Sequence, residues 1–490
     1  KASDLSIETR LFIDGEYKDA QSQDRFETLN PANGDVIASV VSGDASDIDE
    51  AVASSRRAFR SGVWSRIEPR ERASILQRFA DLVQAQAETL AILETLDTGK
   101  PVLTALEDDV LGSIEEMRYF AELCDKVEGI VTATRSDALH YVLRQPLGIV
   151  GAIVPWNFPL AMALTKIMPA LAAGNCVVLK PAEQSPLSAI VLGRLFVEAG
   201  GPPGVLNVVP GFGHTAGKAL ALHNDVDKIG FTGSVEIGKL MLVYAGQSNM
   251  KRVTTECGGK SPQIILDDVR DLDAAVEGAV NGIYYNQGEV CCAGSRLLVQ
   301  RGIYDEFVDR FEKKTRETIV MGHPFDPSTT MGPLVTSAHQ KRVLDYIDLG
   351  KKEGANLVFG GGEGAGELSS GAYVEPTLFS GVNNSMKIVR EEIFGPVTGG
   401  MPIDDLSQGL EIANDSIFGL AASVWTSDVS RAHRFARDME AGVIWVNCYD
   451  EGDSTTPFGG FKQSGNGRDG CAETMLEYTQ TKSVWTEIGE

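Results

Sequence analysis

The chain has 490 residues, of which 43% are apolar and 23% charged, a composition typical of soluble globular proteins with two or three domains. Its formal net charge of −24, from 44 basic and 68 acidic residues, argues against nucleic acid or an anionic membrane as a partner. No apolar run predicts a transmembrane helix, and Lys1-Ala2-Ser3-Asp4 lacks a signal-peptide layout, so we expect a cytoplasmic protein. The first residue is not Met, which leaves the native start open.

The cysteines and histidines predict no metal site. The seven cysteines form no Cys-x-x-Cys pair, and the six histidines are scattered without metal-ligand spacing. An odd number of cysteines in a long chain is typical of a reducing compartment, with buried thiols and one reactive thiol.

The first 125 residues are mostly helical in pattern, after a hairpin at 11–17 around an Asp-Gly turn. Ser46 and Asp49 predict the capping box of a first helix. A long amphipathic helix follows, with apolar residues at helical spacing over 75–83, and Gly99 ends this helical stretch.

From residue 147 the pattern alternates between strands and helices. Strands are predicted at 147–154, 176–180, 205–209, 228–232 and 250–255. Ser185 is expected to cap the helix that begins at Pro186. This rhythm predicts an open, mostly parallel sheet that binds ligands at the carboxyl ends of its strands.

A second α/β rhythm begins after residue 258, with strands at 264–266 and 297–300 and a helix at 304–319. The sequence therefore predicts an α/β protein with two doubly wound sheets. Segments 139–143 and 483–488 alternate polar and apolar residues, which indicates strands added at the sheet edges, with pairing across subunits as one interpretation.

Three short stretches carry groups for thiol chemistry: a thiol in 286–296, a carboxylate at Glu256 and a carboxamide at Asn157. These supply the nucleophile, base and oxyanion donor of acyl chemistry. Each has a plainer interpretation, as a core cysteine, a salt-bridged carboxylate and a turn residue. Glycines flank the thiol and the carboxylate, which favours close approach by a ligand. From the residues alone, Cys291 and Cys292 are both candidates for the nucleophile.

Two further stretches are suited to a dinucleotide. In 231–238 a strand enters a Gly233-Ser234 turn before a helix, which offers free N–H groups to a phosphate, although a tight turn alone also explains it. Glu183, after the strand ending at Lys180, could accept hydrogen bonds from ribose hydroxyls, but an exposed Glu is usually only solvated.

Taken together these motifs resemble the NAD(P)-dependent aldehyde dehydrogenase superfamily over nearly the whole chain. The motifs are Pro155-Trp156-Asn157-Phe158-Pro159, Lys180-Pro181-Ala182-Glu183, Phe231-Thr232-Gly233-Ser234, Glu256-Cys257-Gly258-Gly259-Lys260, Gly288-Glu289-Val290-Cys291, Glu391-Glu392-Ile393-Phe394-Gly395-Pro396 and Pro457-Phe458-Gly459-Gly460. The resemblance implies a dinucleotide-binding domain (1–125 and 147–258), a catalytic domain (259–472) and a small β oligomerisation arm (126–146 and 473–490) in a homodimer or homotetramer.

By this resemblance Cys291 is the nucleophile, and Asn157 with the Cys291 N–H holds the oxyanion. Glu256 activates the water that releases the acid, and Lys166 with Asp469 is the proton relay. The cofactor-binding positions implied are Val154, Pro155, Trp156, Lys180, Glu183, Gly213, Phe231, Gly233, Ser234, Ile237, Gly258, Glu392 and Phe394. Glu183 would repel a 2′-phosphate, so NAD is favoured over NADP as cofactor.

The expected substrate tunnel departs from many aliphatic-aldehyde members, because Thr165 and Gly452 replace aromatic residues. Its implied lining is Phe158, Thr165, Cys292, Asp450, Glu451, Asp453 and Phe458. The 447–469 region is most similar to bacterial γ-glutamyl-γ-aminobutyraldehyde and guanidinobutyraldehyde dehydrogenases of polyamine catabolism. One hypothesis is that the acidic loop receives a cationic aldehyde; the alternative is a solvated loop. A coenzyme A-acylating semialdehyde dehydrogenase and a non-catalytic, crystallin-like relative are the competing functions.

Overall fold

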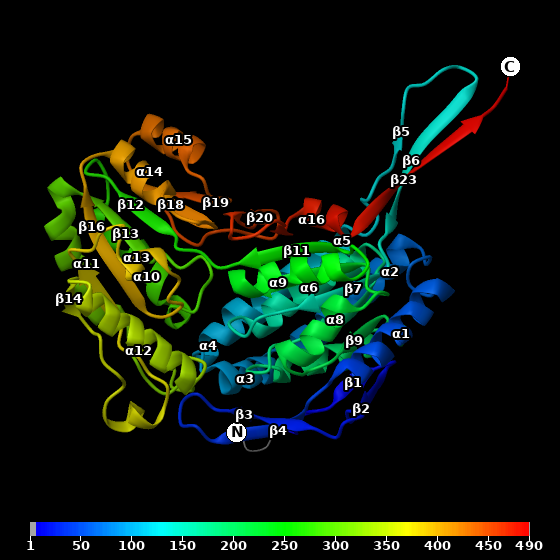
Figure 1. Ribbon diagram of the computed structural model, residues 1–490, viewed down its shortest axis with the longest axis horizontal. Coiled ribbons are helices and arrows are strands. Elements are labelled where there is room, and N and C mark those ends of the chain that lie inside the picture. Colours follow the sequence, from blue (N-terminus) through cyan, green and yellow to red (C-terminus); the bar gives the residue numbers. More distant parts are fainter. Residues whose placement is uncertain (1–5, 490) are drawn as a thin grey trace.

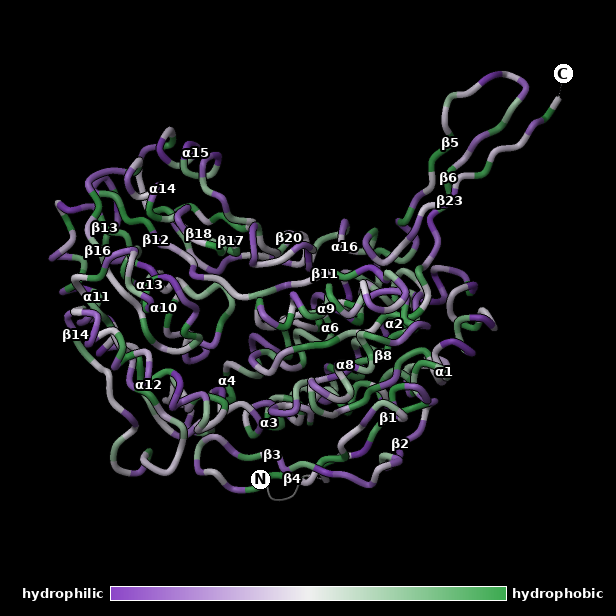
Figure 2. The backbone as a smooth tube through the Cα atoms, in the orientation of Figure 1, coloured by the Kyte–Doolittle hydropathy of each residue, from purple (hydrophilic) through white to green (hydrophobic). Residues whose placement is uncertain are grey.

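The computed structural model describes residues 6–489, so the first four residues, on which the signal-peptide prediction rests, lie outside the described part. Two seven-stranded sheets form the two halves of the molecule, and a thin three-stranded arm projects from one of them (Figure 1). Figure 2 shows hydrophobic strands inside each half and more hydrophilic residues along the outer helices. Within residues 6–489, every helix falls short of the length and apolar character that crossing a membrane requires.

The first sheet has the strand order β11-β10-β7-β8-β9-β1-β2. The first five strands run parallel, and the β1–β2 hairpin closes one edge antiparallel. The strands are β1 (Leu11–Ile13), β2 (Glu16–Lys18), β7 (Ile149–Ile153), β8 (Cys176–Lys180), β9 (Leu206–Val208), β10 (Lys228–Gly233) and β11 (Arg252–Cys257). Strands β7 and β8 are wholly buried, as expected for parallel strands covered on both faces.

Helices from the first half of the chain cover this sheet. They are α1 (Ala45–Ser61), α2 (Pro69–Ala85), α3 (Ala87–Thr98), α4 (Val102–Thr104), α5 (Gly112–Glu122), α6 (Pro159–Ala172), α7 (Leu187–Glu198), α8 (Lys218–Leu222) and α9 (Val235–Gln247). A π-helical turn, Ala105–Leu111, joins α4 to α5, and a separate hairpin pairs β3 (Arg25–Leu29) with β4 (Val36–Val41).

The second sheet has the order β14-β15-β16-β13-β12-β18-β19, parallel except for its edge strand β14. The strands are β12 (Pro262–Ile265), β13 (Arg296–Gln300), β14 (Asn356–Phe359), β15 (Thr377–Ser380), β16 (Val397–Ile403), β18 (Ala421–Trp425) and β19 (Val443–Val446). Its helices are α10 (Leu272–Tyr284), α11 (Tyr304–Thr318), α12 (Ser337–Lys352), α13 (Lys387–Arg390), α14 (Leu406–Asn414) and α15 (Val429–Asp438). The predicted α/β architecture with two mostly parallel sheets is confirmed.

The chain returns to the first half after β19. Two short ladders, β17 (Phe418–Gly419) with β21 (Phe461–Lys462) and β20 (Pro457–Phe458) with β22 (Asp469–Gly470), precede α16 (Ala472–Glu477). Figure 1 shows β20 between the two halves and α16 on the first half, near β11. Met475 and Tyr478 pack into the core of the first half, which ties the end of the chain to it.

The arm consists of β5 (Ile130–Val131), β6 (Ala138–Pro146) and β23 (Thr479–Glu487). Strands β6 and β23 pair antiparallel along their whole length, with Leu139 opposite Thr486. The two alternating segments are therefore strands, but the prediction that they extend the edges of the main sheets is wrong. They pair with each other in a separate sheet.

Two predicted caps are also wrong. The first helix is capped by Asp44, whose carboxylate accepts from Ser46 N and Asp47 N, while Asp47 accepts from Asp44 N. Ser185 donates instead to the carbonyl of Trp156. The first cap is shifted by two residues, from Ser46 to Asp44, and the Ser185 hydroxyl is used in a tertiary hydrogen bond. The local pattern identified neither arrangement.

The long helix predicted before Gly99 is interrupted once. Helix α2 ends at Ala85, and α3 begins at Ala87 after the non-helical Gln86. Gly99 ends α3 with a φ of 78°, in the left-handed conformation that glycine adopts without steric cost.

Candidate active site

The loop that follows α10 presents the adjacent cysteines. Asn286 (φ 46°), Gln287 (φ 58°) and Gly288 (φ 72°) are three consecutive left-handed residues. The left-handed backbone conformation costs a non-glycine residue of order 1–3 kcal/mol, so other contacts must hold Asn286 and Gln287 in it. The Asn286 side chain donates to the Asn157 carbonyl at 3.1 Å, and Gln287 Oε1 accepts from Gly332 N at 3.0 Å. The loop is thus held in a strained conformation by contacts to distant segments.

Cys291 and Cys292 differ in environment. Cys291 is partly exposed and lines a channel of about 930 Å³ between the two halves. Cys292 is buried, and its Sγ lies 3.4 Å from Asp450 Oδ1. The neighbouring Cys291 thiol, followed by burial, raises the pKa of Cys292 well above its usual value. These contacts favour Cys291 as the accessible thiol of the pair.

Asn157 lies in the turn between β7 and α6. Its Nδ2 donates to the Glu289 carbonyl at 2.9 Å, and the residue is 5% exposed. One amide N–H is used in this contact, and the second is available to a ligand, because a carboxamide carries two N–H donors. The turn therefore places an amide donor beside the thiol loop.

Glu256 stands near the end of β11, buried, with neither carboxylate oxygen bonded to another described residue. A side chain at Gly459 would lie 2.8 Å from Glu256 Oε1, so glycine at that position leaves room for the carboxylate. Burial, followed by the nearby charge of Asp469, raises the pKa of Glu256 well above its usual value. A carboxylate with a raised pKa is a stronger base than an ordinary glutamate, which suits it to take a proton from water.

Beside Glu256, Lys166 and Asp469 form a buried ion pair. Lys166 Nζ lies 2.8 and 2.6 Å from the two carboxylate oxygens of Asp469. The ammonium of Lys166 counteracts the rise of the Glu256 pKa. The sequence-predicted catalytic groups are thus brought together from five separate segments.

Part of the channel lining comes from the N-terminus of α9, and this part is called the cofactor branch. Ser234 caps this helix, accepting from Ile237 N at 3.4 Å, and Gly233 and Ser234 line the channel. A side chain at Gly238 would lie 2.8 Å from Cys257 Sγ, so glycine lets the helix start approach β11. The helix dipole and free N–H groups at this end favour a phosphate.

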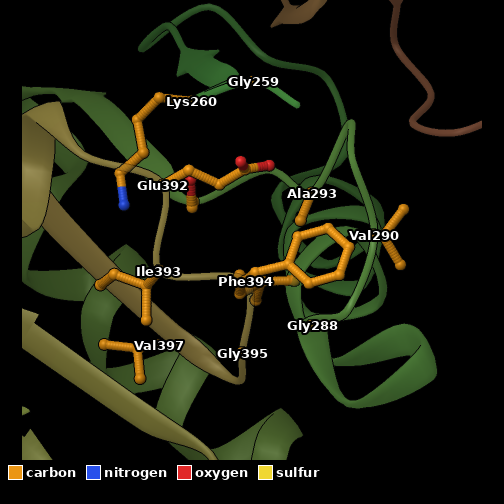
Figure 3. A pocket seen from close by; sticks show the side chains of 12 residues that line it. Gly259, Lys260, Gly288, Val290, Ala293, Glu392, Ile393, Phe394, Gly395 and Val397 are labelled. Carbon is orange, nitrogen blue, oxygen red and sulfur yellow. The ribbon is translucent and has the colours of Figure 1, made fainter. Parts of the chain in front are cut away.

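Glu392 and Phe394 line the same channel. Figure 3 shows both residues beside a smaller adjoining pocket, with Gly259, Lys260 and Gly288. Glu392 Oε1 is buried without a partner among the described residues, and burial raises the pKa of Glu392 to about 7. A Cβ at Gly258 would lie 1.8 Å from that oxygen, so only glycine is compatible with this position of Glu392. Phe394, at φ 61°, packs edge-on against Trp156 with ring centroids 5.4 Å apart.

These features fit a dinucleotide. The unpaired Glu392 oxygen, with room left by Gly258, can accept a hydrogen bond from a ribose hydroxyl, and the N-terminus of α9 can bind a phosphate. Pro155, Trp156 and Thr232 also line this branch. Six predicted cofactor residues do not line it: Val154, Lys180, Glu183, Gly213, Phe231 and Ile237. Lys180 is buried and donates to Glu183 Oε2 at 3.1 Å at the end of β8. Val154 and Phe231 are buried behind the site.

The part of the channel away from α9 is called the substrate branch. Its lining includes all the tunnel residues predicted from the sequence, Phe158, Thr165, Cys292, Asp450, Glu451, Asp453 and Phe458. Phe158 stacks on Tyr285 with centroids 6.2 Å apart, and Lys100 Nζ lies 3.8 Å from the centre of its ring. Thr165 Oγ1 donates to Glu116 Oε2 at 3.0 Å.

Sequence reasoning missed Glu116, Tyr285, Met162, Trp445 and Arg342, which also line the channel. Tyr285 adjoins the thiol loop and Met162 lies one turn from Thr165, so proximity to known motifs could have indicated them. Glu116 had no such signal, because a glutamate pair on an amphipathic helix is typical of a solvated face.

Comparisons with known proteins are consistent with this geometry. The model of the "Aldehyde dehydrogenase family" matches residues 17–484. The chain is 48% identical to the NADP/NAD-dependent aldehyde dehydrogenase PuuC of Escherichia coli (strain K12), over 100% of this chain and 97% of PuuC.

Two solved structures superpose closely. The P. syringae indole-3-acetaldehyde dehydrogenase in complex with NAD+ and IAA has a TM-score of 0.98 and 51% identity, covering 99% of this chain and 98% of that one. The γ-glutamyl-γ-aminobutyraldehyde dehydrogenase from Burkholderia cenocepacia J2315 has a TM-score of 0.97 and 49% identity, covering 100% and 98%.

Proposed function

This chain belongs to the aldehyde dehydrogenase family, and from that premise we propose that it oxidises an ω-amino or γ-glutamylamino aldehyde to the acid through Cys291, with NAD as the cofactor. The observation that supports the proposal is a single channel. It is lined both by the residues suited to a dinucleotide, at the N-terminus of α9 and at Glu392, and by Cys291, Asn157 and Glu256.

In the first step the Cys291 thiolate attacks the aldehyde carbon. A C–S bond forms, the carbonyl π bond breaks, and the oxyanion accepts hydrogen bonds from the free Asn157 Nδ2–H and the Cys291 backbone N–H. NAD, when bound, supplies the hydride acceptor that allows this thiohemiacetal to become a thioester. Ser234, Glu392 and Phe394 are the residues that would hold it beside Cys291.

Hydrolysis then releases the acid. Glu256 takes a proton from water, which attacks the thioester carbon, and the C–S bond breaks to return the Cys291 thiolate. Lys166 and Asp469 lie beside Glu256 and provide a route for its proton. A carboxylate at this position favours hydrolysis over acyl transfer to coenzyme A, which is the alternative reaction. The presence of both Cys291 and Glu256 disfavours a non-catalytic role.

NAD is favoured over NADP because Glu183 would meet a 2′-phosphate. Lys180 pairs with that carboxylate at 3.1 Å and offsets part of its charge, so we expect a modest preference. PuuC is named as NADP/NAD-dependent, which supports this expectation.

The ω-amino substrate is favoured by the charge of the channel. Glu116, Asp450, Glu451 and Asp453 line the substrate branch, and the B. cenocepacia relative is a γ-glutamyl-γ-aminobutyraldehyde dehydrogenase. Carboxylates in a narrow cleft attract cations and raise their local concentration. The P. syringae relative is named an indole-3-acetaldehyde dehydrogenase, so uncharged aldehydes that carry an aromatic ring are the competing substrate class.

We propose that the arm makes the protein a homodimer or homotetramer. Ile130, Val131 and Trp485 are 59%, 73% and 51% exposed on a sheet without a core of its own. A second copy of the chain would cover them.

The test is a panel of 3-aminopropanal, butanal and indole-3-acetaldehyde, each with NAD and with NADP, without coenzyme A. Formation of free acid with the highest kcat/KM for 3-aminopropanal supports the proposal. Dependence on coenzyme A would overturn hydrolytic release, and a preference for either uncharged aldehyde would overturn the ω-amino assignment.

A further inference from the structure

Glu116 of α5 reaches the substrate branch behind Thr165 of α6. Its Oε2 accepts from Thr165 Oγ1 at 3.0 Å, which fixes the carboxylate. Its Oε1 is buried and has no partner among the described residues, although the residue lines the channel. A buried acceptor left without a donor costs about 1–3 kcal/mol, so this oxygen is poised for a ligand donor.

The neighbouring carboxylates are differently engaged. Asp450 Oδ1 lies 3.4 Å from Cys292 Sγ, and Asp453 Oδ1 accepts from Thr455 N and Oγ1 in its own exposed loop. Asp108 Oδ2 accepts from Tyr285 Oη at 3.0 Å. Glu116 thus differs from them in combining a fixed carboxylate with an open buried oxygen in the channel.

Thr165 lies beside this carboxylate in the channel wall. A threonine side chain is short, and Glu116, Met162 and Thr165 all line the channel. The aromatic ring of Phe158 supplies an apolar surface for the methylene stem of a substrate. The branch therefore offers an apolar path with an anionic acceptor beside it.

We propose that Glu116 is a specificity-determining residue whose Oε1 receives the ω-ammonium of the aldehyde. This inference rests on the proposed function and names the group that selects the substrate within it. A charge-assisted N–H···O bond to a desolvated carboxylate is among the stronger hydrogen bonds in proteins. An alkyl group of the same size cannot make it and would leave the oxygen unpaired.

The test uses 3-aminopropanal and butanal, which differ only in an ammonium for a methyl group. The readout is the ratio of their kcat/KM values, in which general damage to the site cancels. Glu116→Gln should lower the ratio roughly 10- to 100-fold, mainly through the KM of the cationic aldehyde. The control Glu122→Gln, an exposed glutamate of the same helix, should leave the ratio unchanged.

A second variant, Thr165→Phe, keeps Glu116 but blocks the approach to it, and should lower the ratio in the same way. Its result decides the case if Glu116→Gln fails to fold. A high wild-type ratio that both folded variants retain would overturn the role of Glu116 and leave the ω-amino function intact. A wild-type ratio near one would instead overturn the ω-amino function itself.

Discussion

Asn157 Nδ2 donates to the backbone carbonyl of Glu289, two residues before Cys291, at 2.9 Å. This bond joins residues 132 positions apart in sequence and ties the β7–α6 turn to the thiol loop. The reverse contact, from Asn286 Nδ2 to the Asn157 carbonyl, closes the same junction. The proposed oxyanion donor and the proposed nucleophile are thereby held together before any substrate binds.

Replacing Asn157 with Ala should lower kcat/KM about 10²- to 10³-fold, because one of the two oxyanion donors is lost. Steady-state kinetics with 3-aminopropanal measures this. The rate at which iodoacetamide alkylates Cys291 serves as the control for an intact loop. A loss below about threefold would contradict a role of Asn157 in holding the oxyanion.

Glu256→Gln should allow one turnover and then stop. Reduced cofactor should form in a burst equal to the active sites, while thioester hydrolysis falls about 10²- to 10⁴-fold without the general base. Stopped-flow absorbance of the reduced nicotinamide separates the two phases. A variant with normal steady-state turnover and no burst would show that another group activates water.

The wild-type hydrolysis step should accelerate as pH rises. Burial favours the neutral form of Glu256 and raises its pKa, so the basic form appears only above the ordinary glutamate pKa of about 4.3. The Asp469 carboxylate raises it further, and the Lys166 ammonium lowers it. The pH profile of the step after the burst measures this, and a pH-independent step would contradict the assignment.

The preference for a cationic aldehyde should also grow with pH. Burial raises the pKa of Glu116 to about 7, with Asp469 raising and Thr165 and Lys166 lowering it. Below that pH the carboxyl is neutral; above it the carboxylate is charged, while an alkylammonium with a pKa of about 10 stays protonated. The ratio of kcat/KM for 3-aminopropanal to butanal should rise several-fold from about pH 6 to 8, and a falling ratio would contradict this.

Lys100→Met should destabilise the fold by about 3–5 kcal/mol, because it leaves a buried charge without its partner. Lys100 forms a buried salt bridge with Asp109, and both side chains are 0% exposed. The double variant Lys100→Met/Asp109→Leu removes both charges and should recover much of the loss. Urea unfolding measures both, and equal destabilisation by the single and double variants would contradict this account.

Much of the fold could be predicted from local pattern. The βα rhythm of 147–255 and the second rhythm after 258 reflect hydrophobic periodicity, which the sheets preserve. The family resemblance is confirmed by the match over residues 17–484. The cap at Asp44 was not identified, because several polar residues there compete for the same backbone groups.

The channel could be predicted only in part. Cys291, Asn157 and Glu256 stand in short sequence motifs, and those motifs allowed their catalytic roles to be predicted. Glu116 stands in no motif, and its proximity to Thr165 depends on how α5 packs on α6, a contact that local periodicity does not encode. The arm shows the same limit, since β6 and β23 are more than 330 residues apart and pair through tertiary structure.

The central claim is that Cys291, rather than its neighbour, carries the oxidation. The direct measurement compares Cys291→Ala with Cys292→Ala by following reduced nicotinamide and by mass spectrometry of enzyme quenched during turnover. Cys291→Ala should form no reduced cofactor and no acyl adduct, whereas Cys292→Ala should retain much of its activity with the adduct on Cys291. An active Cys291→Ala variant, or an adduct on Cys292 in the wild-type enzyme, would contradict the account.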